Sequence, residues 1–255
     1  MAEAVRPLVI AHRGASGTCP ENTLAAFRRA EALGAAMVEL DVQLTRDGQV
    51  VVIHDLLLDR TTDGTGPVGD RSLEELRVLD AGGWFSRAFA GERVPLLADV
   101  LDAVSLAVNV ELKAPVAEGL EARTLAVVEK AGALDRVVFS SFDPTALDRL
   151  RALSSVATIG VLWEEDPIPM ALRVAERVGA RALHVRKDMA TPETISLARA
   201  ADLKTRAWTV NGREEFDLLA DRGVDAVFTD FPERFLLNSM PGPPPSEGGG
   251  RRPSS

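Results

Sequence analysis

The chain has 255 residues, 46% of them hydrophobic, which is enough to build one large α/β domain or two small domains. Its 38 acidic and 29 basic residues give a net charge of −9, which argues against binding to nucleic acids and against stable association with an anionic membrane surface. The single cysteine, Cys19, excludes an internal disulfide. Because the first residues lack a long apolar segment and no later window approaches about 18 uninterrupted apolar residues, we expect a cytoplasmic protein.

Short β-rich runs alternate along the chain with amphipathic segments of about 10–15 residues, a pattern typical of repeated βα units around a parallel sheet. The expected strands are 8–11, 36–42, 106–112, 136–140, 157–163, 181–185, 205–210 and 225–229. Residues 50–54 form a further apolar run. Because the turn at Asp47-Gly48 precedes it, we expect this run to pair antiparallel with 36–42 as a hairpin extension.

Helix start signals precede several of the segments between the expected strands. They are Pro20, the pair Asp143-Pro144 and the pair Thr191-Pro192. Eight strands followed by helices at this chain length predict an α/β protein with a (β/α)8 TIM barrel, with an open doubly wound sheet as the alternative.

We expect residues 1–239 to form one barrel domain and residues 240–255, rich in Pro, Gly and Ser, to form a disordered tail. Residues 56–98 interrupt the βα rhythm with a small insertion after the second strand. This insertion has a helix start at Ser72 with Glu75 three residues on, and it carries a group of aromatic residues, Trp84, Phe85 and Phe89. It could be a surface excursion packed on the barrel rim. We favour a cap over the barrel mouth, because it leaves from the end that carries the charged strand tips.

Ionisable residues gather at the carboxyl ends of the expected strands, where barrel active sites form. The candidate site residues are His12, Arg13, Glu39, Asp41, His54, Glu111, Lys113 and Trp208. Since residues two apart in a strand share a face, Glu39 and Asp41 project side by side, and so do Glu111 and Lys113.

Neighbouring carboxylates repel each other, so a cation should lie between them. Glu39, Asp41 and Glu111 provide three oxygen donors, which suit Ca²⁺ or Mg²⁺ better than zinc. A salt bridge to Arg13 or Lys113 could account for one of these acids, but not comfortably for all three. We therefore expect a divalent cation at these carboxylates.

The position of two histidines, His12 and His54, beside such an acidic cluster favours a catalytic role over a structural one. Asp55 could orient His54 or simply cap the turn. His184 has no evident partner, so we interpret it as structural. Trp208 is equally compatible with barrel packing and with a wall against the organic part of a substrate. Cys19 lacks an assigned base, so we do not interpret it as a nucleophile.

Several segments resemble, in order and spacing, the glycerophosphodiester phosphodiesterase family over about residues 8–235. They are AHRGASGTCPENT, VELDVQLTRDGQVVVIHDLLLDRTTDGTG, ELRVLDAGGWF, VNVELK, AWTVN and VFTDFP. The resemblance implies a (β/α)8 barrel of the phosphoinositide-phospholipase-C kind with a small insertion after the second strand. It implies that Glu39, Asp41 and Glu111 bind a divalent cation, that His12 and His54 are the acid/base pair, and that Arg13 and Lys113 hold the phosphate. Glu21 and Asn22 would lie near the site.

The activity so implied is metal-dependent hydrolysis of a glycerophosphodiester to glycerol 3-phosphate and an alcohol. We expect His12 to act as the base and His54 as the acid. The nucleophile is either water or a glycerol hydroxyl that first forms a cyclic phosphate. The alternatives are a lysophospholipase D or cyclising phospholipase acting on lipids, and a non-catalytic barrel that binds a glycerophosphodiester or a metal.

Overall fold

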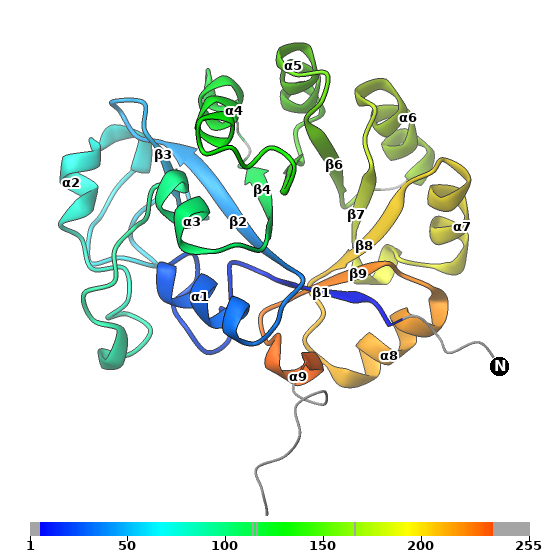
Figure 1. The fold of residues 1–255 in the computed structure, drawn as a ribbon, viewed down its shortest axis with the longest axis horizontal. Helices are drawn as coiled ribbons and strands as arrows, with labels where there is room; N and C mark the ends of the chain where they lie inside the picture. Colours follow the sequence, from blue (N-terminus) through cyan, green and yellow to red (C-terminus); the bar gives the residue numbers. More distant parts are fainter. Residues whose placement is uncertain (1–5, 114, 116, 166, 237–255) are drawn as a thin grey trace, which may run out of the picture.

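Eight parallel strands form a closed barrel in the computed structural model, which describes residues 6–113, 115, 117–165 and 167–236 (Figure 1). The barrel strands are β1 (Leu8–Ala11), β2 (Met37–Leu44), β4 (Ala107–Leu112), β5 (Val137–Ser141), β6 (Thr158–Trp163), β7 (Ala182–Arg186), β8 (Lys204–Trp208) and β9 (Ala226–Thr229). Pairing of β1 with both β9 and β2 closes the sheet. The barrel prediction is therefore confirmed, and the open doubly wound alternative is wrong.

A ninth strand, β3 (Val50–Val52), pairs antiparallel with the end of β2 and lies outside the barrel, as the Asp47-Gly48 turn predicts. Helices lie between successive barrel strands and after the last (Figure 1). They are α1 (Leu24–Ala32), α3 (Leu97–Ala103), α4 (Leu120–Lys130), α5 (Pro144–Leu153), α6 (Ile168–Val178), α7 (Pro192–Ala200), α8 (Arg213–Arg222) and α9 (Glu233–Leu236).

Capping side chains fix where the helices begin. Asp143 accepts a hydrogen bond from the Thr145 backbone N–H with Pro144 in the first turn, and Thr191 caps α7 in the same way, so both predicted starts are confirmed. The expected start at Pro20 is wrong. There the Thr23 side chain is the N-cap, because it accepts a hydrogen bond from the Ala26 N–H, and the helix begins at Leu24, four residues after Pro20.

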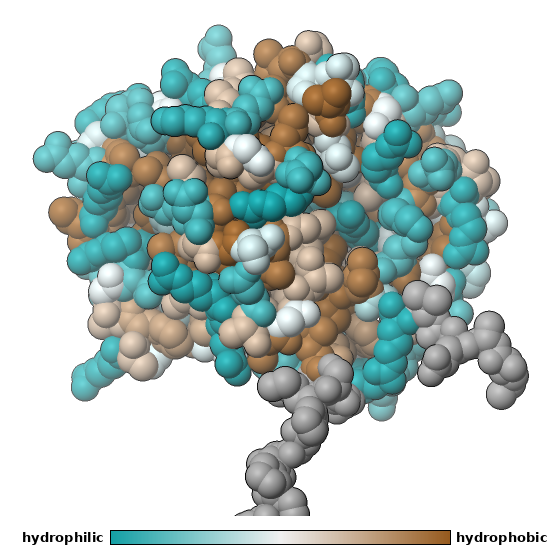
Figure 2. Space-filling view, in the orientation of Figure 1, coloured by the Kyte–Doolittle hydropathy of each residue, from teal (hydrophilic) through white to brown (hydrophobic). Residues whose placement is uncertain are grey.

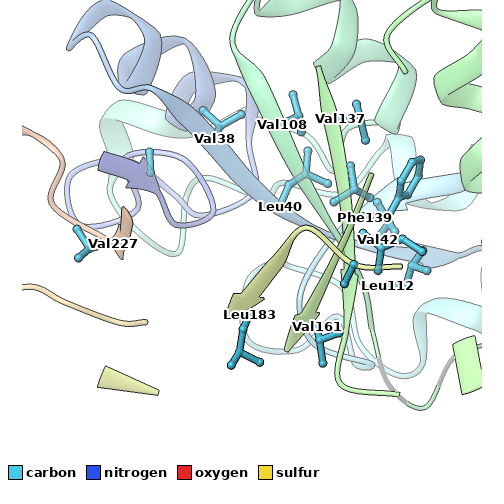
Figure 3. Close-up of a cluster of buried hydrophobic side chains, with 14 of the residues drawn as sticks. Val38, Leu40, Val42, Val108, Leu112, Val137, Phe139, Val161, Leu183 and Val227 are labelled. Atoms are coloured by element: carbon cyan, nitrogen blue, oxygen red, sulfur yellow. The ribbon is translucent and has the colours of Figure 1, made fainter. Parts of the chain in front are cut away.

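The two faces of each barrel strand carry different side chains, because successive side chains along a strand point to opposite sides. Val38, Leu40 and Val42 point from one side of β2 into the apolar layer beneath the helices, and the same layer continues over β4 to β9 (Figure 3). The intervening positions, Glu39 and Asp41, are left for the barrel interior. The ionisable groups of this strand are therefore compatible with a fully packed core.

The insertion has a small apolar core of its own, made by residues such as Leu58, Val68 and Leu76 together with Val51 and Ile53 of the hairpin. It contains the short helices α2 (Leu73–Arg77), η1 (Val68–Asp70) and η2 (Arg87–Phe89), and it lies on the flank of the barrel beside β3 (Figure 1). Ser72 and Glu75 form the capping box that the sequence indicates. The aromatic residues cluster edge to face, Trp84 with Phe85 and Phe85 with Phe89.

Hydrophilic side chains cover most of the periphery of the face shown in Figure 2, with hydrophobic residues visible between them. In the described part of the chain, no helix has both the length and the apolarity that crossing a bilayer requires. A third 3₁₀ helix of the described residues, η3 (Lys187–Met189), follows β7, in addition to η1 and η2. The expected tail, residues 240–255, and the last residues of the expected domain lie outside the described residues.

Candidate active site

A cavity of about 220 Å³ lies among residues at and near the carboxyl ends of the barrel strands. Seven of the predicted site residues line it: His12, Arg13, Glu39, His54, Glu111, Lys113 and Trp208. The eighth, Asp41, is only 1% exposed and sits behind them. None of the lining residues comes from the insertion 56–98. The insertion therefore contributes no side chain to the cavity lining, and its own apolar core packs against the hairpin. Its role as a cap over the mouth stays a prediction.

Glu39, Asp41 and Glu111 form a cluster of buried carboxylates. One oxygen of each lies within 4.8 Å of the others. Strand register explains this arrangement, because Asp41 of β2 pairs directly with Glu111 of β4 and Glu39 lies two positions before Asp41 on the same face. The sequence-predicted ligand set is thus brought together at one point.

Two fixed cations adjoin this cluster. Lys113 Nζ lies 2.7 Å from Glu111 Oε1 and 3.4 Å from Asp41 Oδ1, while Arg13 Nε lies 3.4 Å from Asp41 Oδ2. Glu39 accepts a hydrogen bond from the Arg13 backbone N–H at 2.9 Å. No ion pair joins Glu39 to a lysine or arginine side chain in the described part of the chain. Three buried carboxylates therefore share two cations.

The pKa values reflect this imbalance. Burial and the negative charge of Asp41 raise the pKa of Glu39 to about 8. Burial also disfavours the charged form of Asp41, but Arg13 and Lys113 outweigh it and lower the Asp41 pKa to about 2. A cluster of three oxygen donors with one uncompensated carboxylate fits a hard divalent cation, which would replace the proton on Glu39. The residues present therefore fit the expected metal.

His12 follows β1 in a tight turn. Arg13 and Gly14 both have positive φ, +56° and +79°, and a Cβ on Gly14 would lie 2.6 Å from the Ala26 backbone, so glycine is required there. His12 Nδ1 lies 2.7 Å from Asp230 Oδ1, and Nε2 lies 3.9 Å from Glu39. Burial lowers the pKa of His12, but the hydrogen bond to Asp230 and the charge of Glu39 outweigh it, so the net pKa is raised.

His54 reaches the same cavity through the hairpin. It follows β3, and Gln43 of β2 donates from Nε2 to the carbonyl oxygens of Ile53, His54 and Asp55, which fixes the backbone there. His54 Nδ1 lies 2.6 Å from Asp55 Oδ1, so the predicted orienting contact is present. Burial lowers the pKa of His54, and the nearby positive charge of Arg13 adds to this effect. Each histidine thus pairs with an aspartate through Nδ1.

An apolar wall faces these charged groups. Trp208 and Phe142 line the cavity with ring centroids 5.6 Å apart in an edge-to-face arrangement, and Leu162 and Phe228 continue the wall. Trp208 packs against other barrel residues and also lines the cavity. A packing role and a role as a wall against a substrate are therefore compatible for this residue. The cavity therefore offers one polar and one apolar side to a bound molecule.

Two supporting residues have clear roles that the sequence did not assign. Asn22, named only as a neighbour of the site, donates from Nδ2 to Asp41 Oδ2 at 2.8 Å. Asp230, the partner of His12, directly follows β9. Reading the end of the last strand as closely as the others would have found Asp230. Asn22 gives no such signal, because it lies in a turn and meets Asp41 only through the fold.

Neither of the two residues interpreted as non-catalytic lines this cavity. Cys19 is buried, and burial raises the pKa of its thiol. His184 is fully buried inside the barrel against Phe228, with ring centroids 5.2 Å apart. Neither ring nitrogen of His184 has a hydrogen-bond partner among the described residues.

The barrel and this cavity are those of a (β/α)8-barrel hydrolase. The model of the "Glycerophosphoryl diester phosphodiesterase family" matches residues 12–234. A "Glycerophosphodiester phosphodiesterase" of Caldanaerobacter subterraneus subsp. tengcongensis is 40% identical over 240 residues, covering 91% of this chain and 97% of the relative. A protein of the same name from Bacillus subtilis is 33% identical, with 90% of this chain and 85% of the relative covered.

Solved structures agree. A phosphodiesterase from Oleispira antarctica, determined in complex with the product sn-glycerol-3-phosphate, superposes with a TM-score of 0.85 at 35% identity, covering 92% of this chain and 98% of that one. A glycerophosphodiester phosphodiesterase from Agrobacterium tumefaciens superposes with a TM-score of 0.79 at 30% identity, covering 91% and 99%. The chain belongs to the glycerophosphoryl diester phosphodiesterase family.

Proposed function

We propose that this protein hydrolyses sn-glycero-3-phosphodiesters, such as glycerophosphocholine or glycerophosphoethanolamine, to glycerol 3-phosphate and a free alcohol, and that the reaction requires a divalent cation. The observation that carries the proposal is that two aspartate-paired histidines open onto the same cavity as a cluster of buried carboxylates. Family membership and the product bound by the Oleispira antarctica enzyme support it.

Charge stabilisation is the main demand of this chemistry. A phosphodiester carries one negative charge, and attack by an oxygen nucleophile adds charge to its non-bridging oxygens. Glu39, Asp41 and Glu111 would hold Ca²⁺ or Mg²⁺, which when bound supplies positive charge against that build-up. Arg13 and Lys113 line the cavity beside these acids and would bind the phosphate oxygens. Contact with the acids holds both side chains in place before substrate arrives.

Proton transfer falls to the two histidines. One accepts a proton from the nucleophile and the other donates one to the leaving alcohol, so they need opposite protonation states at the working pH. The contacts of Nδ1 with Asp230 and Asp55 leave Nε2 of each ring for these transfers. We propose that His12 accepts and His54 donates. The raised pKa of His12 and the lowered pKa of His54 oppose this order, but a cation beside Glu39 would offset one of the charges that raise the pKa of His12. The nucleophile is water, or a glycerol hydroxyl that forms a cyclic phosphate which water then opens.

Trp208 is proposed to contact the organic part of the substrate from the apolar wall. The substrate is a small molecule, and we propose neither a nucleic-acid partner nor stable membrane association, because the chain is acidic. A cytoplasmic location likewise stays a prediction.

Phosphorus NMR of the purified, metal-loaded protein with a mixture of glycerophosphodiesters tests the proposal. We expect the diester signal to convert to that of a phosphomonoester, and EDTA to stop the conversion. A cyclic phosphate as the final product would indicate a cyclising phospholipase instead. An unchanged diester would favour a non-catalytic barrel that only binds such molecules.

A further inference from the structure

Arg60 joins two acidic side chains near the polar site, Asp55 and Glu21. Its Nε and Nη2 atoms donate to Asp55 Oδ2 and Oδ1 at 2.6 and 2.9 Å. Its Nη1 and Nη2 atoms donate to Glu21 Oε2 and Oε1 at 2.7 and 2.8 Å. The guanidinium thus makes a bidentate contact with each of two carboxylates, an arrangement that the planar donor fork of arginine permits.

Each of these carboxylates also contacts one residue of the proposed machinery. Asp55 Oδ1 lies 2.6 Å from His54 Nδ1, and Glu21 Oε1 accepts from Arg13 Nη1 at 2.8 Å. A continuous chain of contacts therefore runs from His54 through Arg60 to Arg13. Arg60 itself does not line the cavity.

The insertion holds Arg60 in a fixed turn. Leu58 is buried in the apolar core of the insertion, its N–H donates to the Gly66 carbonyl at 3.0 Å, and its own carbonyl accepts from the Thr62 N–H at 3.0 Å. The Gly66 N–H donates in turn to Asp59 Oδ2 at 2.9 Å. The guanidinium therefore extends from a backbone that is restrained on both sides.

Both acids depend on Arg60 for charge compensation. Its hydrogen bonds are the largest cause that lowers the pKa of Asp55 and the largest that lowers the pKa of Glu21 against the effect of burial. Without Arg60, the carboxylate of Asp55 would have only His54 as a partner, and that of Glu21 only Arg13, among the contacts described. Each carboxylate would then be free to rotate, and it would no longer hold His54 or Arg13 in one orientation.

We propose that Arg60, supplied by the insertion, is a positioning residue that orients His54 through Asp55 and Arg13 through Glu21. This inference rests on the proposed function. It gives the insertion a part in the site although none of its residues lines the cavity, because it contributes the cation that contacts both Asp55 and Glu21.

The variant Arg60→Ala tests the proposal, with glycerophosphocholine as the substrate and purified metal-loaded protein. We expect kcat to fall about tenfold or more, because His54 loses its orientation. We expect KM to rise, because Arg13, which would bind the phosphate, loses its orientation as well. Arg60→Lys keeps one charge but cannot contact both carboxylates in bidentate fashion, so we expect an intermediate loss. Arg46→Ala is the matched control, since Arg46 is also exposed and paired with an acid, Glu75, but lies away from the cavity.

Double variants separate positioning from a general loss of stability. If Arg60 acts on His54 through Asp55, Asp55→Asn should lower kcat, and adding Arg60→Ala to it should change kcat by less than about twofold. In the same way, adding Arg60→Ala to Glu21→Gln should leave the raised KM nearly unchanged. The proposal would be overturned if the effects on kcat of Arg60→Ala and Asp55→Asn multiplied, and those on KM of Arg60→Ala and Glu21→Gln did so too. An Arg60→Ala variant as active as Arg46→Ala would also overturn it.

Histidine NMR provides a readout that does not depend on turnover. We expect the Nδ1 proton of His54, bonded to Asp55, to shift in Arg60→Lys and to stay unchanged in Arg46→Ala. An unshifted signal in Arg60→Lys would contradict the proposal, even if Arg60→Ala proves too unstable to assay. A wild-type protein inactive on glycerophosphodiesters would contradict the proposed function instead, while leaving this NMR result readable.

Discussion

His12 Nδ1 lies 2.7 Å from Asp230 Oδ1, across the seam where the first barrel strand pairs with the last. Asp230 is itself held by Asn211, whose Nδ2 donates to Oδ2 at 2.7 Å, and by Ser16, whose hydroxyl donates to Oδ1 at 3.1 Å. The carboxylate is therefore fixed before it orients the imidazole. The contact that orients His12 therefore depends on the pairing of β1 with β9 that closes the barrel.

Removing this carboxylate should impair the reaction without unfolding the protein. We expect Asp230→Ala to lower kcat by about 10- to 100-fold, because the His12 ring loses the contact that fixes its orientation and tautomer. Steady-state kinetics with a thermal melt would measure this. Asp188→Asn, which loses only an exposed pair with Arg186, should keep full activity. Equal activity of the two variants would show that Asp230 is not needed to orient His12.

The acid and base roles of the two histidines can be assigned by comparing substrates with different leaving groups. His12→Ala and His54→Ala should each lower turnover of glycerophosphocholine by about 10²- to 10⁴-fold. A glycerophosphodiester with a nitrophenol leaving group needs no proton donor, so it should largely restore the activity of His54→Ala but not that of His12→Ala. If the nitrophenol substrate restored the activity of His12→Ala alone, the assigned roles would be reversed. If neither variant lost activity on glycerophosphocholine, the acid/base pair would be wrong.

Metal binding should stabilise the fold as well as permit turnover. At a concentration about 100 times its Kd, Ca²⁺ or Mg²⁺ would raise the free energy of unfolding by about 2.7 kcal/mol. We expect this as a rise in melting temperature that EDTA reverses and that Asp41→Asn abolishes. Glu129→Gln, an exposed change on α4, should leave the rise intact. A melting temperature that no divalent cation changes would contradict a metal site at these carboxylates.

His184 should make stability depend on pH. Burial lowers its pKa well below 6.5, and the positive charge of Arg206 on the neighbouring strand adds to this. The unfolded chain therefore binds a proton that the folded chain does not, and the free energy of unfolding falls as the pH drops below about 6.5, by up to about 1.4 kcal/mol per pH unit. Above that pH, His184 has no such effect.

Chemical unfolding of the wild type and of His184→Met at pH 7.5 and 5.5 would measure this contribution. Methionine is uncharged at both values, so the variant should lose less stability on acidification than the wild type does. An identical loss in both proteins would mean that other groups account for the acid sensitivity.

Strand periodicity predicted the barrel, with an open sheet as the alternative, and it placed most of the candidate site residues at the mouth. Alternation within a strand puts Glu39 and Asp41 on one face, and the shared mouth of a parallel barrel brings in Glu111 from the next barrel strand. Local rules of this kind hold because they depend on backbone geometry. They place residues on a common surface without knowledge of loop conformation.

Contacts made by loops were not predictable in the same way. Pro20 is a valid helix-start signal, but the chain from Arg13 to Thr23 folds as a turn, with Arg13 and Asn22 both at positive φ, and the helix starts later. The position of the insertion also depends on its packing against Val51 and Ile53 rather than on the point where it leaves the barrel. Such outcomes are set by tertiary contacts between segments distant in sequence.

The hairpin register has an evolutionary consequence. Val42 pairs with Val52 and Leu44 with Val50, and this register sets the face of the hairpin on which the side chains of β3 and the adjoining His54 lie. Insertion or loss of one residue that shifted this register would rotate His54 to the opposite face, whereas a shift by two would preserve its side. A length change in this turn is therefore expected to preserve a working His54 only where it leaves the register unchanged or shifts it by two.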